Sequence, residues 1–68
     1  MPCVKVDIVA GRTPEQKKKA ADAITDALVE HCSAHREHVY VIFNDIDDTD
    51  WTVAGVTVAE RKRARGEV

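Results

Sequence analysis

Three successive segments of this chain carry different patterns, and their order restricts the fold. Residues 2–9 alternate between two faces with a period of two, which is typical of a β-strand. Residues 14–33 repeat apolar side chains every three or four positions, which predicts a helix. Residues 39–44, VYVIFN, are rich in β-branched and aromatic residues and predict a second strand. This order predicts a βαβ unit with a right-handed crossover and two parallel strands.

The sequence TPEQ marks where the helix is expected to begin. Thr13 is a good N-cap, Pro14 suits the first helical position, and Gln16 stands where a capping box needs it. The apolar stripe expected to face the sheet consists of Ala20, Ala21, Ile24, Ala27, Leu28 and Cys32.

The last third of the chain is expected to hold short elements. Residues 45–51, DIDDTDW, are acidic and predict a loop, and residues 53–58 predict a short hairpin that turns near Gly55. Residues 60–68 predict a basic tail. The fold class is therefore α/β (α+β), with residues 1–68 forming one domain: a single βαβ unit followed by a short carboxyl-terminal hairpin.

The length of the chain bears on its stability. A chain of 68 residues buries only roughly 60% of its unfolded surface, which is marginal for a monomer. One helix covers one face of a two-stranded sheet, and parallel sheets rarely leave the other face in water. We therefore expect a homo-oligomer that completes the core.

Charge and cysteine content restrict the partners. The formal net charge is −2, and no aromatic stacking platform accompanies the basic run ERKRAR, so no nucleic acid partner is expected. Two cysteines allow at most one disulfide, and no secretory or membrane-spanning apolar segment is visible. We expect a cytoplasmic protein with reduced thiols and no membrane partner.

Two parts of the sequence partly match metal-site patterns. His31 and His35 are four residues apart, as on a zinc-binding helix, but no second cysteine lies at zinc spacing. The acidic loop has the general character of a calcium loop, but Asp50 stands at the glycine position and Val56 at the glutamate position. No metal site is predicted.

Four features together resemble the tautomerase superfamily, and within it the 4-oxalocrotonate tautomerase-like family. They are a strand headed by Pro2, the sequence GRTPEQK after it, the βαβ unit, and a tryptophan before a glycine-containing hairpin. The resemblance runs without a gap from Pro2 to about Lys62. It implies a tautomerase-like fold, no cofactor, and a hexamer, a trimer of dimers, whose pockets draw residues from neighbouring subunits.

The resemblance also assigns roles to four residues. Pro2, exposed as the amino terminus once Met1 is removed, is implied to be the catalytic general base and acid. Arg12 is implied to bind the carboxylate of a small carboxylic acid substrate and to withdraw electron density, and Trp51 to wall the pocket. Tyr40 stands where well-known members carry a second arginine, so it is a candidate substrate contact. Without that arginine, both monocarboxylates and dicarboxylates remain open as substrates.

The amine chemistry is consistent with these roles. An α-amino group ordinarily titrates at about 7.7–8.0, and a proline amine is more basic. A Pro2 base therefore needs a lowered pKa, which apolar surroundings and a neighbouring guanidinium such as that of Arg12 supply.

These inferences predict a cofactor-free enol–keto tautomerase acting on small 2-hydroxy-dienoate or enol-pyruvate type acids. Two alternatives stay open. One is a haloacrylate hydratase (dehalogenase) or decarboxylase of the same superfamily, in which Pro2 is a cationic acid. The other is a non-enzymatic homo-oligomeric binding module.

Overall fold

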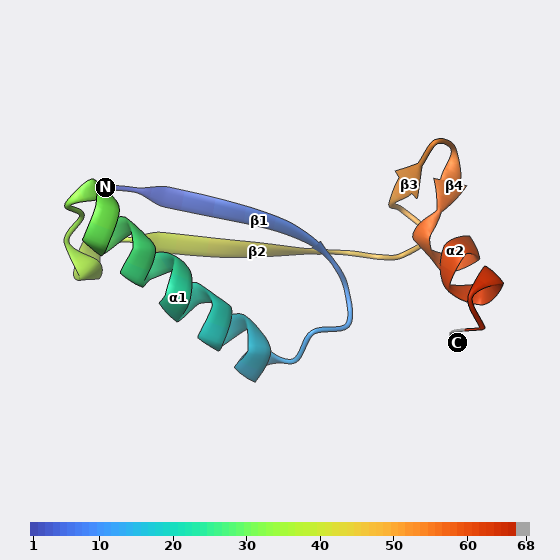
Figure 1. Cartoon of the computed structure of the whole chain (residues 1–68), viewed down its shortest axis with the longest axis horizontal. Helices are drawn as coiled ribbons and strands as arrows, with labels where there is room; N and C mark the ends of the chain where they lie inside the picture. Colours follow the sequence, from blue (N-terminus) through green and yellow to red (C-terminus); the bar gives the residue numbers. More distant parts are fainter. Residues whose placement is uncertain (67–68) are drawn as a thin grey trace.

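A computed structural model describes residues 1–66 of the chain, and residues 3–46 form a βαβ unit (Figure 1). Strand β1 (Cys3–Val9) leads into helix α1 (Pro14–Cys32), and strand β2 (Tyr40–Ile46) follows. The two strands are parallel, in a register that runs from Cys3 opposite Tyr40 to Val9 opposite Ile46. The predicted βαβ arrangement is therefore confirmed.

The carboxyl-terminal elements lie apart from this unit. Strands β3 (Thr52–Val53) and β4 (Val56–Thr57) form a short antiparallel hairpin, and helix α2 (Val58–Ala64) follows directly. Figure 1 shows them beyond the carboxyl ends of β1 and β2, at the opposite end of the molecule from the amino terminus. The predicted hairpin is present.

Helix α1 begins as its sequence predicts. The Thr13 hydroxyl oxygen accepts a hydrogen bond from the backbone N–H of Gln16 at 3.1 Å. The Gln16 side-chain oxygen accepts one from the backbone N–H of Thr13 at 2.9 Å. This reciprocal pair is a capping box, which satisfies two backbone N–H groups that would otherwise lack partners. These two hydrogen bonds fix the first turn of α1.

The helix face toward the sheet differs from the predicted stripe. Ala20, Ala27 and Cys32 are exposed, whereas Thr25, which the apolar pattern leaves out, is the most buried side chain at 9% exposure. A threonine is tolerated there because its hydroxyl donates to the Ala21 carbonyl oxygen at 2.8 Å. The inward face is the narrower set of Lys17, Ala21, Ile24, Thr25 and Leu28.

The second strand is longer than residues 39–44. It begins at Tyr40 and continues through Asp45 and Ile46, two residues that the sequence predicts to lie in the loop. Pairing with β1 extends the strand, and the carboxylate of Asp45 lies 2.5 Å from the ammonium of Lys17 on α1. Tertiary contacts therefore override the low strand propensity of aspartate.

Much of the basic segment predicted over 60–68 is helical, because it continues helix α2 over residues 58–64. The Thr57 hydroxyl oxygen caps this helix by accepting from the N–H of Glu60 at 3.1 Å. The sequence TVAE at 57–60 has the spacing of a capping box, and this is the signal that predicts the helix. Residues 67–68 of the predicted tail lie outside the described residues.

The chain leaves much of its apolar surface uncovered. Among residues 1–66, no apolar side chain is fully buried, and Tyr40 and Ile42 are 51% and 48% exposed. The radius of gyration is 15.3 Å, against about 11 Å for a compact domain of this length. The side chains of Cys3, Lys5 and Asp7 on β1 are likewise exposed, so the sheet face opposite α1 is open.

Candidate functional site

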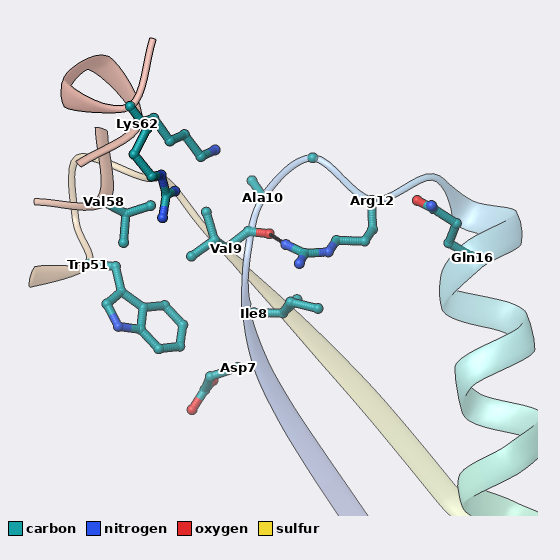
Figure 2. A pocket seen from close by; sticks show the side chains of 11 residues that line it. Asp7, Ile8, Val9, Ala10, Arg12, Gln16, Trp51, Val58 and Lys62 are labelled. Carbon is teal, nitrogen blue, oxygen red and sulfur yellow. Dashed lines mark hydrogen bonds between the residues drawn. The ribbon is translucent and has the colours of Figure 1, made fainter. Parts of the chain in front are cut away.

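A pocket of about 680 Å³ lies between the two parts of the molecule (Figure 2). One wall is the end of β1 with the loop into α1, and the other is formed by Trp51 and helix α2. Both backbone and side chains line it: Asp7, Ile8, Val9, Ala10, Gly11, Arg12, Gln16, Trp51, Val58, Lys62 and Arg65. Of the four predicted site residues, the pocket brings together Arg12 and Trp51.

Arg12 is held where the chain leaves the sheet. The backbone N–H of Ala10 donates to the carbonyl oxygen of Ile46 at 2.7 Å, which extends the pairing one residue beyond β1. Gly11 then adopts φ +133°, a conformation that L side chains rarely adopt. The Arg12 guanidinium turns back and donates from Nη1 to the Val9 carbonyl oxygen at 2.8 Å (Figure 2). Its remaining N–H groups can bind an anion.

Trp51 and α2 are tied together on the other wall. The N–H of Val58 donates to the carbonyl oxygen of Trp51 at 2.8 Å, and the N–H of Ala59 donates to that of Asp48 at 3.1 Å. The ammonium of Lys62 lies 3.7 Å from the carboxylate of Asp48. Trp51 and Lys62 therefore belong to one unit, which is held by backbone hydrogen bonds and an ion pair.

The loop that carries Trp51 is further shaped by Asp47. Its carboxylate accepts from the backbone N–H of Thr49 at 2.9 Å and from the Thr49 hydroxyl at 2.8 Å. These hydrogen bonds, the backbone one first, lower the pKa of Asp47, because both stabilise the charged form.

The charge of the pocket is mainly positive. Three cationic residues line it, Arg12, Lys62 and Arg65, and one acidic residue, Asp7. The Asp7 carboxylate accepts a hydrogen bond from the Asn44 side-chain amide at 3.1 Å. A concave site with clustered cations attracts anions, although the whole chain carries a net charge of −2.

Pro2 and Tyr40 lie together at the other end of the sheet. The backbone N–H of Tyr40 donates to the Pro2 carbonyl oxygen at 3.0 Å. At about 3.3 Å per residue, the seven steps from Pro2 to Val9 span roughly 23 Å. Neither residue lines the pocket of Arg12. One chain thus places Pro2, the predicted base, and Arg12, the residue predicted to bind the substrate carboxylate, at opposite ends of β1.

Metal-binding residues do not converge in the described part of the chain. Among residues 1–66, no group of three or more His, Cys, Asp and Glu side chains is placed to hold a metal ion. The Nε2 atom of His31 is 3.7 Å from the Glu30 carboxylate. The rings of His35 and His38 meet edge to face, with their centroids 5.9 Å apart. Nor does any helix within residues 1–66 have the length and apolarity needed to cross a membrane.

A family model described as "Tautomerase enzyme" matches residues 2–61, most of the chain. The chain belongs to the tautomerase family. Its relatives include a probable tautomerase of Ralstonia nicotianae, 42% identical over 81% of this chain and 85% of that protein. They also include the 2-hydroxymuconate tautomerase of Comamonas testosteroni, 36% identical over 93% of this chain and all of that one.

Solved structures agree with this membership. A 4-oxalocrotonate tautomerase isozyme of Methylibium petroleiphilum superposes with a TM-score of 0.88 and 35% identity, over 93% of this chain and 98% of that one. A heterohexamer 4-oxalocrotonate tautomerase from Chloroflexus aurantiacus gives 0.83 and 30%, over 88% and 97%. The chain is therefore a 4-oxalocrotonate tautomerase-like enzyme, an isomerase, as its sequence predicts.

The pocket also contains residues that the sequence patterns do not single out individually. The sequence places Lys62 and Arg65 in a basic segment as a group, and both line the pocket because Lys62 is on α2 and Arg65 directly follows it. Asp7 and Gln16 also line it. The capping-box spacing TVAE was the available signal for the lysine, since it predicts the helix that positions Lys62.

Proposed function

We propose that this tautomerase interconverts the enol and keto forms of small 2-hydroxy-dienoate or enol-pyruvate type carboxylic acids without a cofactor. The observation that carries the proposal is that Arg12 and Trp51 both line one pocket of about 680 Å³. A guanidinium binds a carboxylate through two parallel hydrogen bonds, and an indole face suits a flat conjugated chain. This is the chemistry of a planar unsaturated acid.

Pro2 is the proposed base. Once Met1 is removed, its secondary amine takes the proton from the 2-hydroxyl group of the dienol and returns it to carbon further along the conjugated system. The carboxylate stays bound to Arg12, which draws electron density toward that end. While Met1 is attached, the Pro2 nitrogen is an amide without basicity, so the proposal requires the mature amino terminus.

We further propose that the complete site takes these residues from two chains of a homo-oligomer, a hexamer built as a trimer of dimers. Pro2 and Arg12 of one chain are separated by the length of β1, so a neighbouring chain has to supply one of them. The exposed sheet face bearing Tyr40 and Ile42 supports such an assembly, because a second chain would cover it. Tyr40 and Trp51 are the proposed substrate contacts.

The proposed location is the cytoplasm, where both thiols stay reduced. Cys3 and Cys32 are exposed and unbonded to one another, which suits a reducing compartment.

The test asks whether tautomerase activity depends on a free amine at Pro2. Intact mass first establishes whether Met1 is absent from the purified chain. Ketonisation of phenylenolpyruvate and 2-hydroxymuconate is then measured for the wild type and for Pro2→Ala. A third chain carries a Gly-Ser extension before Pro2, and its matched control carries the same extension after Val68.

We expect the amino-terminal extension, which turns the Pro2 nitrogen into an amide, to lower kcat/KM by at least about 10²-fold, the usual range for a lost general base. Pro2→Ala leaves a primary amine at the mature terminus, so its loss of kcat/KM should be smaller than that of the extension. The carboxyl-terminal extension is expected to stay within about twofold. Activity should fall as the pH drops through the pKa of the amine, because the base must be neutral; the hydratase alternative requires the opposite trend. Full activity of the amino-terminally extended chain would overturn the proposal.

A further inference from the structure

We infer that Lys62 is a second anion-binding residue of the Arg12 pocket and selects substrates that carry a second carboxylate. The inference rests on the proposed function, since it names a specificity residue of the same site. It starts from the fact that Arg12 and Lys62 line one pocket from opposite walls. Figure 2 shows Arg12 on the side of α1 and Lys62 on the side of α2, with Val9 between them.

The position of Lys62 is fixed by its surroundings. Its side chain is only 34% exposed and pairs with Asp48 at 3.7 Å. Its helix is capped by Thr57 and joined to the Trp51 loop by the hydrogen bonds of Val58 and Ala59. A lysine held in this way loses less conformational freedom on binding than one on an unsupported tail.

The alternative position for a second cation is occupied by a neutral side chain. The residue at position 40 is tyrosine, and it lies beside Pro2, not in this pocket.

The ion pair of Lys62 leaves its ammonium able to bind a ligand. The ammonium nitrogen of Lys62 is 3.7 Å from the Asp48 carboxylate, which is longer than a direct charge-assisted hydrogen bond of about 2.7–2.9 Å. The ammonium of Lys62 therefore retains donors for a ligand carboxylate.

The geometry assigns each part of a diacid to a residue. One carboxylate binds Arg12 and the other binds Lys62, while the conjugated chain between them lies against Trp51. A monoacid of the same length reaches Arg12 and Trp51 only.

The experiment compares two probes of equal length, trans,trans-muconate and sorbate, which differ in having a carboxylate or a methyl group at one end. Trp51 is the only tryptophan of the chain, so quenching of its fluorescence reports binding in this pocket. Dissociation constants are measured at pH 7 for the wild type, Lys62→Met, Lys62→Arg and the control Arg63→Met. Arg63 is on the same helix but exposed, and it does not line the pocket.

We expect the wild type to bind muconate at least tenfold more tightly than sorbate. In Lys62→Met that ratio should fall below threefold, whereas Lys62→Arg and Arg63→Met should keep at least half of it. Lys62→Gln replaces Lys62→Met if circular dichroism shows that the methionine variant is unfolded. A wild-type ratio below threefold, or an unchanged ratio without the Lys62 charge, would overturn the inference.

These outcomes are separable from those of the proposed function, because binding requires no proton transfer. Loss of turnover with an intact muconate-to-sorbate ratio contradicts the proposed reaction and leaves the role of Lys62 standing. Turnover that persists with no such ratio contradicts the role of Lys62 alone.

Discussion

The backbone N–H of Tyr40 donates a hydrogen bond to the carbonyl oxygen of Pro2, with 3.0 Å between nitrogen and oxygen. This bond ties the amino terminus to the start of β2 and puts it at the end of the sheet away from Arg12. At the rise of a strand, Pro2, the proposed base, is about 23 Å from Val9 in the same chain. Val9 is the residue whose carbonyl oxygen accepts from Arg12, the residue proposed to bind the carboxylate. Catalysis that uses both requires contributions from two chains.

Subunit complementation tests this separation. The chain with an amino-terminal extension lacks a basic Pro2, and Arg12→Ala lacks the carboxylate ligand, so each alone should be nearly inactive. When equal amounts are unfolded together and refolded, random assembly gives about a quarter of the sites an intact Pro2 from one chain and an intact Arg12 from another. We expect about a quarter of the wild-type activity in the mixture.

The control for complementation is mixing the two folded proteins without unfolding, which should recover little activity if subunits exchange slowly. A refolded mixture as inactive as its components, with mixed oligomers present by native mass spectrometry, would mean that Pro2 and Arg12 act from the same chain.

The capping box of α1 is expected to stabilise the fold. Thr13→Ala removes the hydroxyl that accepts from Gln16 and should lower the free energy of unfolding by about 1 kcal/mol. The comparison is Lys19→Ala, an exposed helical position where the change should stay within about 0.5 kcal/mol. Urea denaturation at one fixed protein concentration measures both. Equal losses in the two variants would contradict a specific role for the cap.

The hairpin between β3 and β4 contains an unfavourable residue. Ala54 has φ 54° and Gly55 has φ 80°, and left-handed geometry at both central positions of a two-residue turn favours Asn-Gly. Ala54→Asn should therefore raise the free energy of unfolding by about 0.5–1 kcal/mol, and Gly55→Ala should lower it by about 1 kcal/mol. Thermal melts of the two variants should shift in opposite directions; shifts of the same sign would show that backbone strain does not decide stability there.

The lowered pKa of Asp47 predicts a pH dependence. Its folded pKa lies below its unfolded value of about 3.9, so its contribution to stability is fully present above that value and is lost as pH falls through the folded pKa. Asp47→Asn should remove this contribution. The stability difference between wild type and Asp47→Asn is therefore expected to shrink as pH drops below about 4.

Thr49→Ala tests the cause of that shift. It deletes the hydroxyl donor but keeps the backbone N–H, so an NMR titration should show the pKa of Asp47 rising only part of the way to its ordinary value. A titration identical to that of the wild type would contradict a contribution from the hydroxyl.

The local structure of the chain follows closely from its sequence. The alternation in residues 2–9, the capping box at Thr13 and the glycine of the hairpin turn each depend on neighbours a few positions away, and all three are in the structure. The errors occur where distant contacts decide the outcome. Asp45 joins β2 because it pairs with β1 and because Lys17 neutralises its charge. Thr25 is buried because it lies on the face of α1 that turns toward the sheet, which the apolar pattern alone does not identify.

Membership of the tautomerase family, the βαβ order and the identity of Arg12 and Trp51 as pocket candidates could all be determined from the sequence itself. Only the tertiary structure decided that Pro2 pairs with Tyr40 at one end of the sheet, and that α2 brings Lys62 to the pocket of Arg12 at the other. The physical reason is that propensities and caps act over a few residues of sequence. Which side chains share a pocket depends on strand register and on where the packed elements end.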